Sequence, residues 1–135
     1  MKKILMNLGV IVMFLVLAMS AVSAVPPACN GNPGSIWTTR DDCGAEQQDV
    51  NQYAIGEKVF INGKDFCADN YNWDITGQPG GASEDPNVVV ASGSEEVNLD
   101  GSFCLEVYTI QNDDGGEYKV SFGSKHDNYN INKNY

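Results

Sequence analysis

Short runs in which apolar and polar residues alternate are the feature that most constrains this chain. The clearest runs are Tyr71–Ile75, Phe103–Val107 and Tyr118–Phe122, and clusters of glycine, asparagine, aspartate and proline separate such runs. A period of two residues is typical of a strand with one buried face. No window of a dozen residues shows the 3.6-residue period of a helix. We therefore predict an all-β fold, an antiparallel β-sandwich of six or seven strands.

Weaker runs and turn-forming residues complete this pattern. Further strands are expected at Ile36–Thr39, Tyr53–Ile55, Val59–Ile61, Val88–Val90 and Tyr129–Ile131. Asp100-Gly101 and Asp113–Gly116 predict turns, because aspartate and glycine tolerate the backbone angles that turns require. Asn62-Gly63 leaves two alternatives open, a tight hairpin turn or a bulge within one longer strand.

The first 24 residues have the three parts of a secretory signal peptide. Lys2 and Lys3 form a positive start, Leu8–Met19 is an uncharged apolar run, and small residues precede a cleavage site after Ala24. An uncleaved membrane anchor is the alternative, since Ile4–Ala24 is close to the roughly 20 residues that span a bilayer. Asparagine and serine within that stretch favour cleavage, and we predict a protein that is secreted or held in the cell envelope.

The composition divides the chain into four predicted parts. They are a signal peptide over 1–24, a disulfide-stapled N-terminal segment over 25–50, the sandwich over 51–132, and a frayed C-terminus over 133–135.

Four cysteines remain after the predicted cleavage, and an even number in a small exported chain indicates disulfides. Three pairings are possible. We favour Cys29–Cys43, which would staple an irregular glycine- and proline-rich stretch, together with Cys67–Cys104, which would join two strand ends. The alternative of a thiolate metal site is disfavoured, because such ligands usually come in CxxC pairs and the chain has none.

Acidic residues outnumber basic residues by 18 to 8, which gives a formal net charge of −10. Because a chain with this negative charge repels phosphate backbones, we expect no nucleic-acid partner. The expected partner is an extracellular protein or glycan, with no stable membrane span after cleavage. The sequence leaves the oligomeric state open.

Three segments resemble the immunoglobulin-like sandwich. Gly56–Ile61 is similar to the start of its second strand, and Trp73 follows Ile61 by 12 residues, where the third strand carries a buried tryptophan. Asp114–Val120 resembles the D-x-G-x-Y-x-C signature, so the resemblance assigns Tyr118 to a tyrosine corner, whose hydroxyl bonds back to upstream backbone. The structural core that this resemblance implies comprises Ile61, Trp73, Tyr118 and Val120.

The sequence departs from antibody-type domains at one point. Ile61 and Val120 stand where those domains carry their inter-sheet cysteines, so aliphatic contact would replace the usual bridge. Locally, Tyr71–Ile75 resembles the Y-x-W-D-F core of PKD domains, and Val59–Phe66 resembles the V-x-I-x-G-x-x-F strand of TIG/IPT domains. These resemblances imply a module of secreted or cell-surface proteins, and they imply no particular function, because this architecture hosts many.

Two groups of residues are candidates for binding. The carboxylates of Asp113, Asp114 and Asp127 offer oxygen ligands to Ca²⁺, which takes six to eight. No EF-hand spacing organises these acids, so solvated turns are the preferred interpretation and no cofactor is expected. The second group is a possible ligand face of aromatic side chains, comprising Trp37, Tyr71 and Tyr108.

Catalytic residues are not assigned. His126 is the only histidine, and the nearby Ser121 and Ser124 lack a nucleophile-elbow motif. We therefore expect a non-catalytic binding or structural module that acts in protein interaction or adhesion. The loops 74–86 and 123–128, a sheet face or a sheet edge would bind the partner. The alternative is a small carbohydrate-binding module that uses exposed aromatics.

Overall fold

A computed structural model describes residues 29, 31, 33–40, 43 and 49–133 of the chain. The predicted signal peptide over 1–24 lies outside these residues, as does most of the segment 25–50. Within the described ranges, no helix is both long and apolar enough to cross a bilayer.

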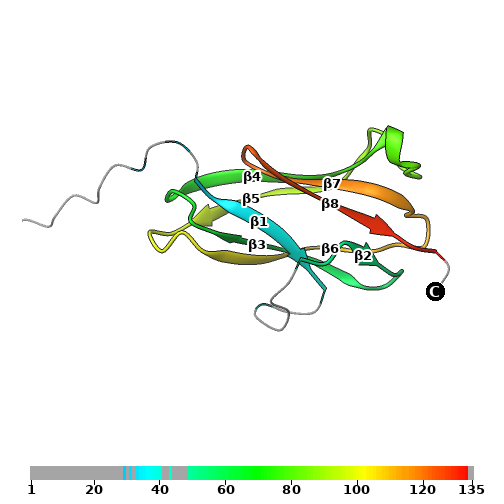
Figure 1. Ribbon diagram of the computed structural model, residues 1–135, viewed down its shortest axis with the longest axis horizontal. Coiled ribbons are helices and arrows are strands. Elements are labelled where there is room, and N and C mark those ends of the chain that lie inside the picture. The colour runs from blue at the N-terminus through cyan, green and yellow to red at the C-terminus, as the bar shows by residue number, and fades with distance from the viewer. Residues whose placement is uncertain (1–28, 30, 32, 41–42, 44–48, 134–135) are drawn as a thin grey trace, which may run out of the picture.

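Eight strands form two sheets that face each other (Figure 1). The three-stranded sheet has the order β1 (Ser35–Thr39), β3 (Lys58–Lys64) and β6 (Phe103–Thr109). The five-stranded sheet has the order β2 (Gln52–Tyr53), β8 (Lys125–Ile131), β7 (Gly116–Phe122), β4 (Asp69–Gly77) and β5 (Val89–Val97). All neighbours are antiparallel except β2 and β8. A single 3₁₀ turn, Pro79–Gly81, is the only helical element in the described part, so the all-β prediction is confirmed.

The hydrophobic core lies between the two layers. Alternation directs every second side chain of a strand inward, and this places Val59 and Ile61 of β3 against Val120 of β7, all fully buried. On β4 the residue directly opposite Val120 is Ile75, which is also fully buried. Trp73 lies two positions away and is only partly buried against this core. The core therefore combines these aliphatic side chains with fully buried aromatic rings such as Tyr118, Phe122 and Tyr129, and Trp73 borders it.

The Asn62-Gly63 pair lies inside β3 and forms no hairpin turn. Gly63 is paired with Phe103 of β6, and a methyl group at Gly63 would lie 2.1 Å from that ring. The bulge in this strand lies between Val59 and Phe60, away from Asn62. Glycine is therefore required here because the phenylalanine ring occupies the space above it.

All four cysteines form disulfides, as predicted, but the preferred pairing was wrong. Cys29 bonds Cys67 and Cys43 bonds Cys104, with Cα–Cα distances of 5.6 and 5.7 Å. The reason is β1, which lies between Cys29 and Cys43 in the chain and pairs with β3. A five-residue strand is roughly 16 Å long, so it separates the two cysteines. Each one reaches a partner from a different part of the sandwich.

Candidate functional site

Tyr118 occupies the position predicted for a tyrosine corner. Its hydroxyl is buried, accepts a hydrogen bond from the backbone N–H of Gly115 at 3.2 Å, and donates one to Oδ2 of Asp85 at 2.5 Å. Burial, and the hydrogen bond to Asp85, raise the pKa of Tyr118 to about 12. The phenol therefore stays neutral and joins β7 to the loop between β4 and β5.

Asp114 has a structural role beside this corner. The side chain is 2% exposed, and its Oδ2 accepts hydrogen bonds from the Gln111 backbone at 2.7 Å and the Tyr108 hydroxyl at 2.8 Å. Burial raises the pKa of Asp114, although both hydrogen bonds oppose that shift. A carboxylate engaged in this way offers little to a cation.

The three aspartates considered for calcium do not converge. Asp113 is exposed in the turn beside Asp114, whereas Asp127 lies on β8 opposite Val120. Val120 lies four residues along β7 from Gly116, which follows the turn that holds Asp113 and Asp114. Asp127 is therefore roughly 13 Å along the sheet from that turn. Among the described residues, no three histidine, cysteine, aspartate or glutamate side chains are grouped to hold a metal.

Asp127 instead faces Asp49. Burial, followed by the charge of Asp49 and a hydrogen bond with it, raises the pKa of Asp127 to about 6. Among the described residues, the buried Oδ2 of Asp127 has no hydrogen-bond partner, while Oδ1 of Asp49 accepts the backbone N–H of Thr38 at 3.3 Å. Burial and a neighbouring carboxylate both disfavour the charged form of Asp127, and this is the cause of its raised pKa.

The aromatic residues predicted as a ligand face lie apart. Trp37 lies on β1, directly opposite Asn62 of β3. Its Nε1 is buried and has no hydrogen-bond partner among the described residues. Tyr71 stacks on Phe122 at 5.3 Å. Tyr108 is on β6 and bonds Asp114. All three are partly buried, and they come from strands in both sheets, so they form no common exposed platform.

His126 lies on an open surface. Its Nδ1 is 3.1 Å from Oγ of Ser121, and Asp74 of β4 lies opposite Ser121 in the next strand. A cavity of about 270 Å³ is lined by Asp69, Glu96, Leu99 and their neighbours, and another of about 300 Å³ is lined by Arg40, Gln52, Tyr53, Ala54 and Glu57. His126 lines neither of these two cavities, and its side chain is exposed.

The outward face of the five-stranded sheet is polar throughout its centre. The register places the following residues on this face: Asn72, Asp74, Thr76, Ser92, Ser94, Lys119, Ser121, His126, Asn128 and Asn130. They are exposed or partly exposed. These side chains offer hydrogen-bond donors and acceptors, and none of them is a phenylalanine, tyrosine or tryptophan.

The edge of the same sheet has a different character. β5 is nine residues long, and among the described strands it pairs with β4 alone, on one side. Its middle, Ser92–Ser94, is exposed, and two apolar side chains at its start, Val88 and Val89, are 49% and 55% exposed. The indole of Trp73 lies over Gly93, where an added Cβ would approach it to 2.7 Å. Sequence reasoning missed this surface, because only Val88–Val90 of β5 has the composition of a strand.

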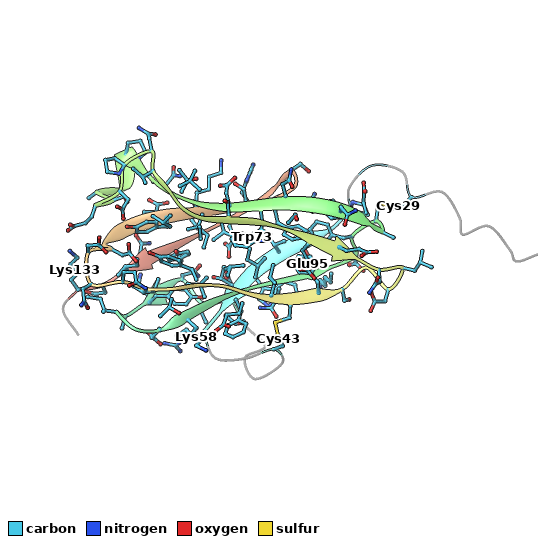
Figure 2. The ribbon with its side chains drawn as sticks, turned by 180° about the vertical axis from the view of Figure 1, so that it is seen from behind. Cys29, Cys43, Lys58, Trp73, Glu95 and Lys133 are labelled. Atoms are coloured by element: carbon cyan, nitrogen blue, oxygen red, sulfur yellow. A yellow bond between two sulfur atoms is a disulfide. The ribbon has the colours of Figure 1, made fainter. Side chains whose placement is uncertain are left out.

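Glu95 adds a charge to the inner side of this edge. It is paired with Tyr71, whose side chain packs on the core, so Glu95 faces inward and is partly buried. Figure 2 views the molecule from this side, with Trp73 and Glu95 labelled between the ribbons of β5 and β6. The edge therefore combines unpaired backbone, a tryptophan face and a carboxylate.

Comparisons with known proteins give no identification. The chain matches no protein-family model, no curated protein and no solved structure. The geometry described above is therefore the basis for the functional conclusion.

Proposed function

We propose that this protein is an exported, non-catalytic binding module that engages an extracellular protein. Two disulfides suit an oxidising compartment outside the cytoplasm. The predicted signal peptide agrees with that location. The exposed setting of His126 and Ser121 supports the non-catalytic part of the proposal.

We also propose that the sandwich is immunoglobulin-like. The order β8-β7-β4-β5 corresponds to strands G, F, C and C′ of that fold, and β1-β3-β6 corresponds to A, B and E. The hydroxyl of Tyr118 bonds back to Gly115, as a tyrosine corner requires. The position of Trp73 is a departure, because it borders the core while Ile75 fills the centre.

The observation that carries the binding proposal is the unpaired edge of β5. Natural proteins usually protect such an edge with proline, lysine, a bulge, an inward-facing charge, a short strand or a covering loop. β5 is long, contains neither proline nor lysine, and begins beside exposed Val88 and Val89, so the bulge opposite Ile75 and the inward-facing Glu95 are the protections that it carries. An edge of this kind supports binding by the addition of a partner strand.

Site-specific photo-crosslinking tests the proposal. A photoreactive residue at Val89 is expected to crosslink a protein in the exported fraction of the producing cells, whereas one at Asn128, on the opposite part of the sheet, is not. An excess of unlabelled protein should compete, and an excess of the Val89→Lys variant should not. Equal crosslinking at both positions, or none at Val89, would contradict a binding edge at β5.

A carbohydrate-binding module is the second candidate, and the polar outer face favours it. Asp74 of β4 and His126 and Asn128 of β8 present hydrogen-bonding groups on either side of β7, a surface suited to sugar hydroxyls. Binding to a glycan array that is lost in His126→Ala and Asn128→Ala, and kept in Val89→Lys, would support this function over protein binding.

A further inference from the structure

We propose that the free edge of β5 binds an extended segment of a partner protein in which two adjacent basic residues lie next to a run of alternating apolar residues. This inference rests on the proposed function and specifies the chemistry of the partner. The segment adds to the five-stranded sheet as a sixth strand, next to β5.

The backbone of β5 supplies the first requirement. In an antiparallel pair, alternate residues direct both N–H and C=O to one neighbour, and the residues between them direct these groups to the other side. Because β4 is the only described strand that pairs with β5, about half of the backbone groups of β5 point away from the sheet. The middle residues, Ser92, Gly93 and Ser94, are small and exposed, so a second backbone can approach to the normal strand spacing.

The side of β5 that faces the core is the reason to expect apolar residues in the partner segment. A bulge opposite Ile75 and Thr76 turns both Val90 and Ala91 toward the core, where they are partly buried. Two residues further along the strand, Gly93 has no side chain, and the Trp73 ring, which is partly exposed, occupies the space that a Cβ there would take. An added strand places alternate side chains on the same inner face, so residues opposite Ala91 and Gly93 would contact apolar surface.

The C-terminal end of β5 is the reason to expect basic residues in the partner segment. Glu95 faces inward and Glu96 faces outward, and neither forms an ion pair with another described residue. Two successive residues of an added strand point to opposite faces. Two adjacent lysines or arginines opposite this pair would therefore each meet one carboxylate.

The negative charge of the chain favours a basic partner over a second copy of the same chain at this edge. Each copy has a formal net charge of −10, and β5 itself carries two acids and no base. In a symmetric pair centred on Gly93, Glu95 and Glu96 would oppose Ala91 and Val90 and gain no counter-charge. Inward-facing acids on an edge strand are a known protection against self-pairing, and they leave the edge available to a cationic strand.

Binding of synthetic peptides to the exported, disulfide-bonded protein tests the inference. The probes are Val-Thr-Val-Thr-Lys-Lys and its reversed sequence, with blocked ends, because a parallel and an antiparallel strand place the lysines in opposite order. Controls replace both lysines with glutamate or N-methylate alternate backbone nitrogens. The chain has two tryptophans, so a Trp37→Phe background leaves Trp73 as the only reporter.

We expect a saturable blue shift of Trp73 fluorescence with one of the two lysine peptides, because the added strand covers the indole. The glutamate peptide should not bind, and N-methylation should abolish binding for one of the two sets of alternate nitrogens. Glu95→Gln should weaken binding by about fivefold, the effect of losing a partly buried ion pair. The charge-matched control Asp113→Asn, in an exposed turn, should leave the affinity unchanged.

Three results would overturn the inference. One is the absence of any shift, a second is equal binding of lysine and glutamate peptides, and a third is binding that N-methylation does not affect. A concentration-dependent dimer that Val89→Lys abolishes would assign the edge to a second copy instead. The photo-crosslinking at Val89 would still succeed with a non-basic protein partner, so failure of this inference is distinguishable from failure of the proposed function.

Discussion

The hydroxyl of Tyr118 donates a hydrogen bond to the carboxylate of Asp85, which lies 33 residues earlier in the chain. The same hydroxyl accepts the backbone N–H of Gly115. One buried oxygen thus joins the start of β7 to the loop between β4 and β5, and it fixes the loop from which β5 begins.

Replacing Tyr118 with phenylalanine should therefore destabilise the fold. The variant keeps the ring and leaves Asp85 and Gly115 without their partner, at a cost of about 1.5–3 kcal/mol in the free energy of unfolding, as for a hydrogen bond to a charged group. Tyr71→Phe is the matched control, since the Tyr71 hydroxyl bonds the Cys67 carbonyl in a more exposed setting. Urea unfolding measures both, and equal losses in the two variants would contradict the role assigned to Tyr118.

Asp127 should make stability depend on pH in an unusual direction. Its folded-state pKa of about 6 is above the ordinary value of about 3.9, so between these values the folded state binds more protons than the unfolded state. The free energy of unfolding contributed by this group therefore falls as the pH rises from about 4 to about 6.

Asp127→Asn should remove that contribution and stabilise the protein at pH 7 by on the order of 1–2 kcal/mol. The measurement is the difference between the stability–pH curves of wild type and variant, which cancels the other carboxyl groups. Asp113→Asn, in an exposed turn, is the control. A flat difference curve for Asp127→Asn would show that the folded protein does not raise the pKa of Asp127.

Both disulfides should contribute strongly to stability. The paired cysteines are 38 and 61 positions apart in the sequence, and in the chain-entropy model each loop corresponds to about 4 kcal/mol. Replacing Cys43 and Cys104 together with serine should lower the free energy of unfolding by about that amount. Peptide mapping without reduction should recover Cys29 with Cys67, and recovery of Cys29 with Cys43 would contradict the structure.

Gly63 should not tolerate alanine. The Phe103 ring occupies the position of the new methyl group, so Gly63→Ala must displace a side chain that stacks on Phe122 at 4.2 Å. Overpacking of this kind costs about 1–3 kcal/mol. Gly80→Ala is the control, because no atom lies within 4 Å of its Cβ position. Thermal unfolding measures both variants. Equal unfolding midpoints for Gly63→Ala and Gly80→Ala would contradict the close contact at Gly63.

Alternation predicted most of the fold. Tyr71–Ile75, Phe103–Val107 and Tyr118–Phe122 each lie within a strand, because a half-buried strand leaves a period of two in the sequence. The second half of β5, Ser92–Val97, was not predicted. Its residues have low strand propensity, and pairing with β4 holds them extended.

The candidate site was less accessible to sequence reasoning than the fold. The disulfide pairing depends on where β1 inserts, which is a tertiary property. The proximity of Asp49 and Asp127 also arises only when two distant segments meet. The one local signal for the β5 edge was the polar segment Ser92–Ser94, which lies between Val88–Val90 and Glu95-Glu96. Its serine and glycine residues have the composition of a loop.

Amide hydrogen exchange over Val89–Val97 tests the central claim most directly, that β5 is paired on one side and free on the other. Alternate amides should be protected by hydrogen bonds to β4, and the amides between them should exchange at close to the rate of an unstructured chain. Uniform protection along β5 would mean that another segment or a second molecule already covers the edge. Uniform exchange would mean that β5 does not belong to the sheet, and either result would contradict a free binding edge at β5.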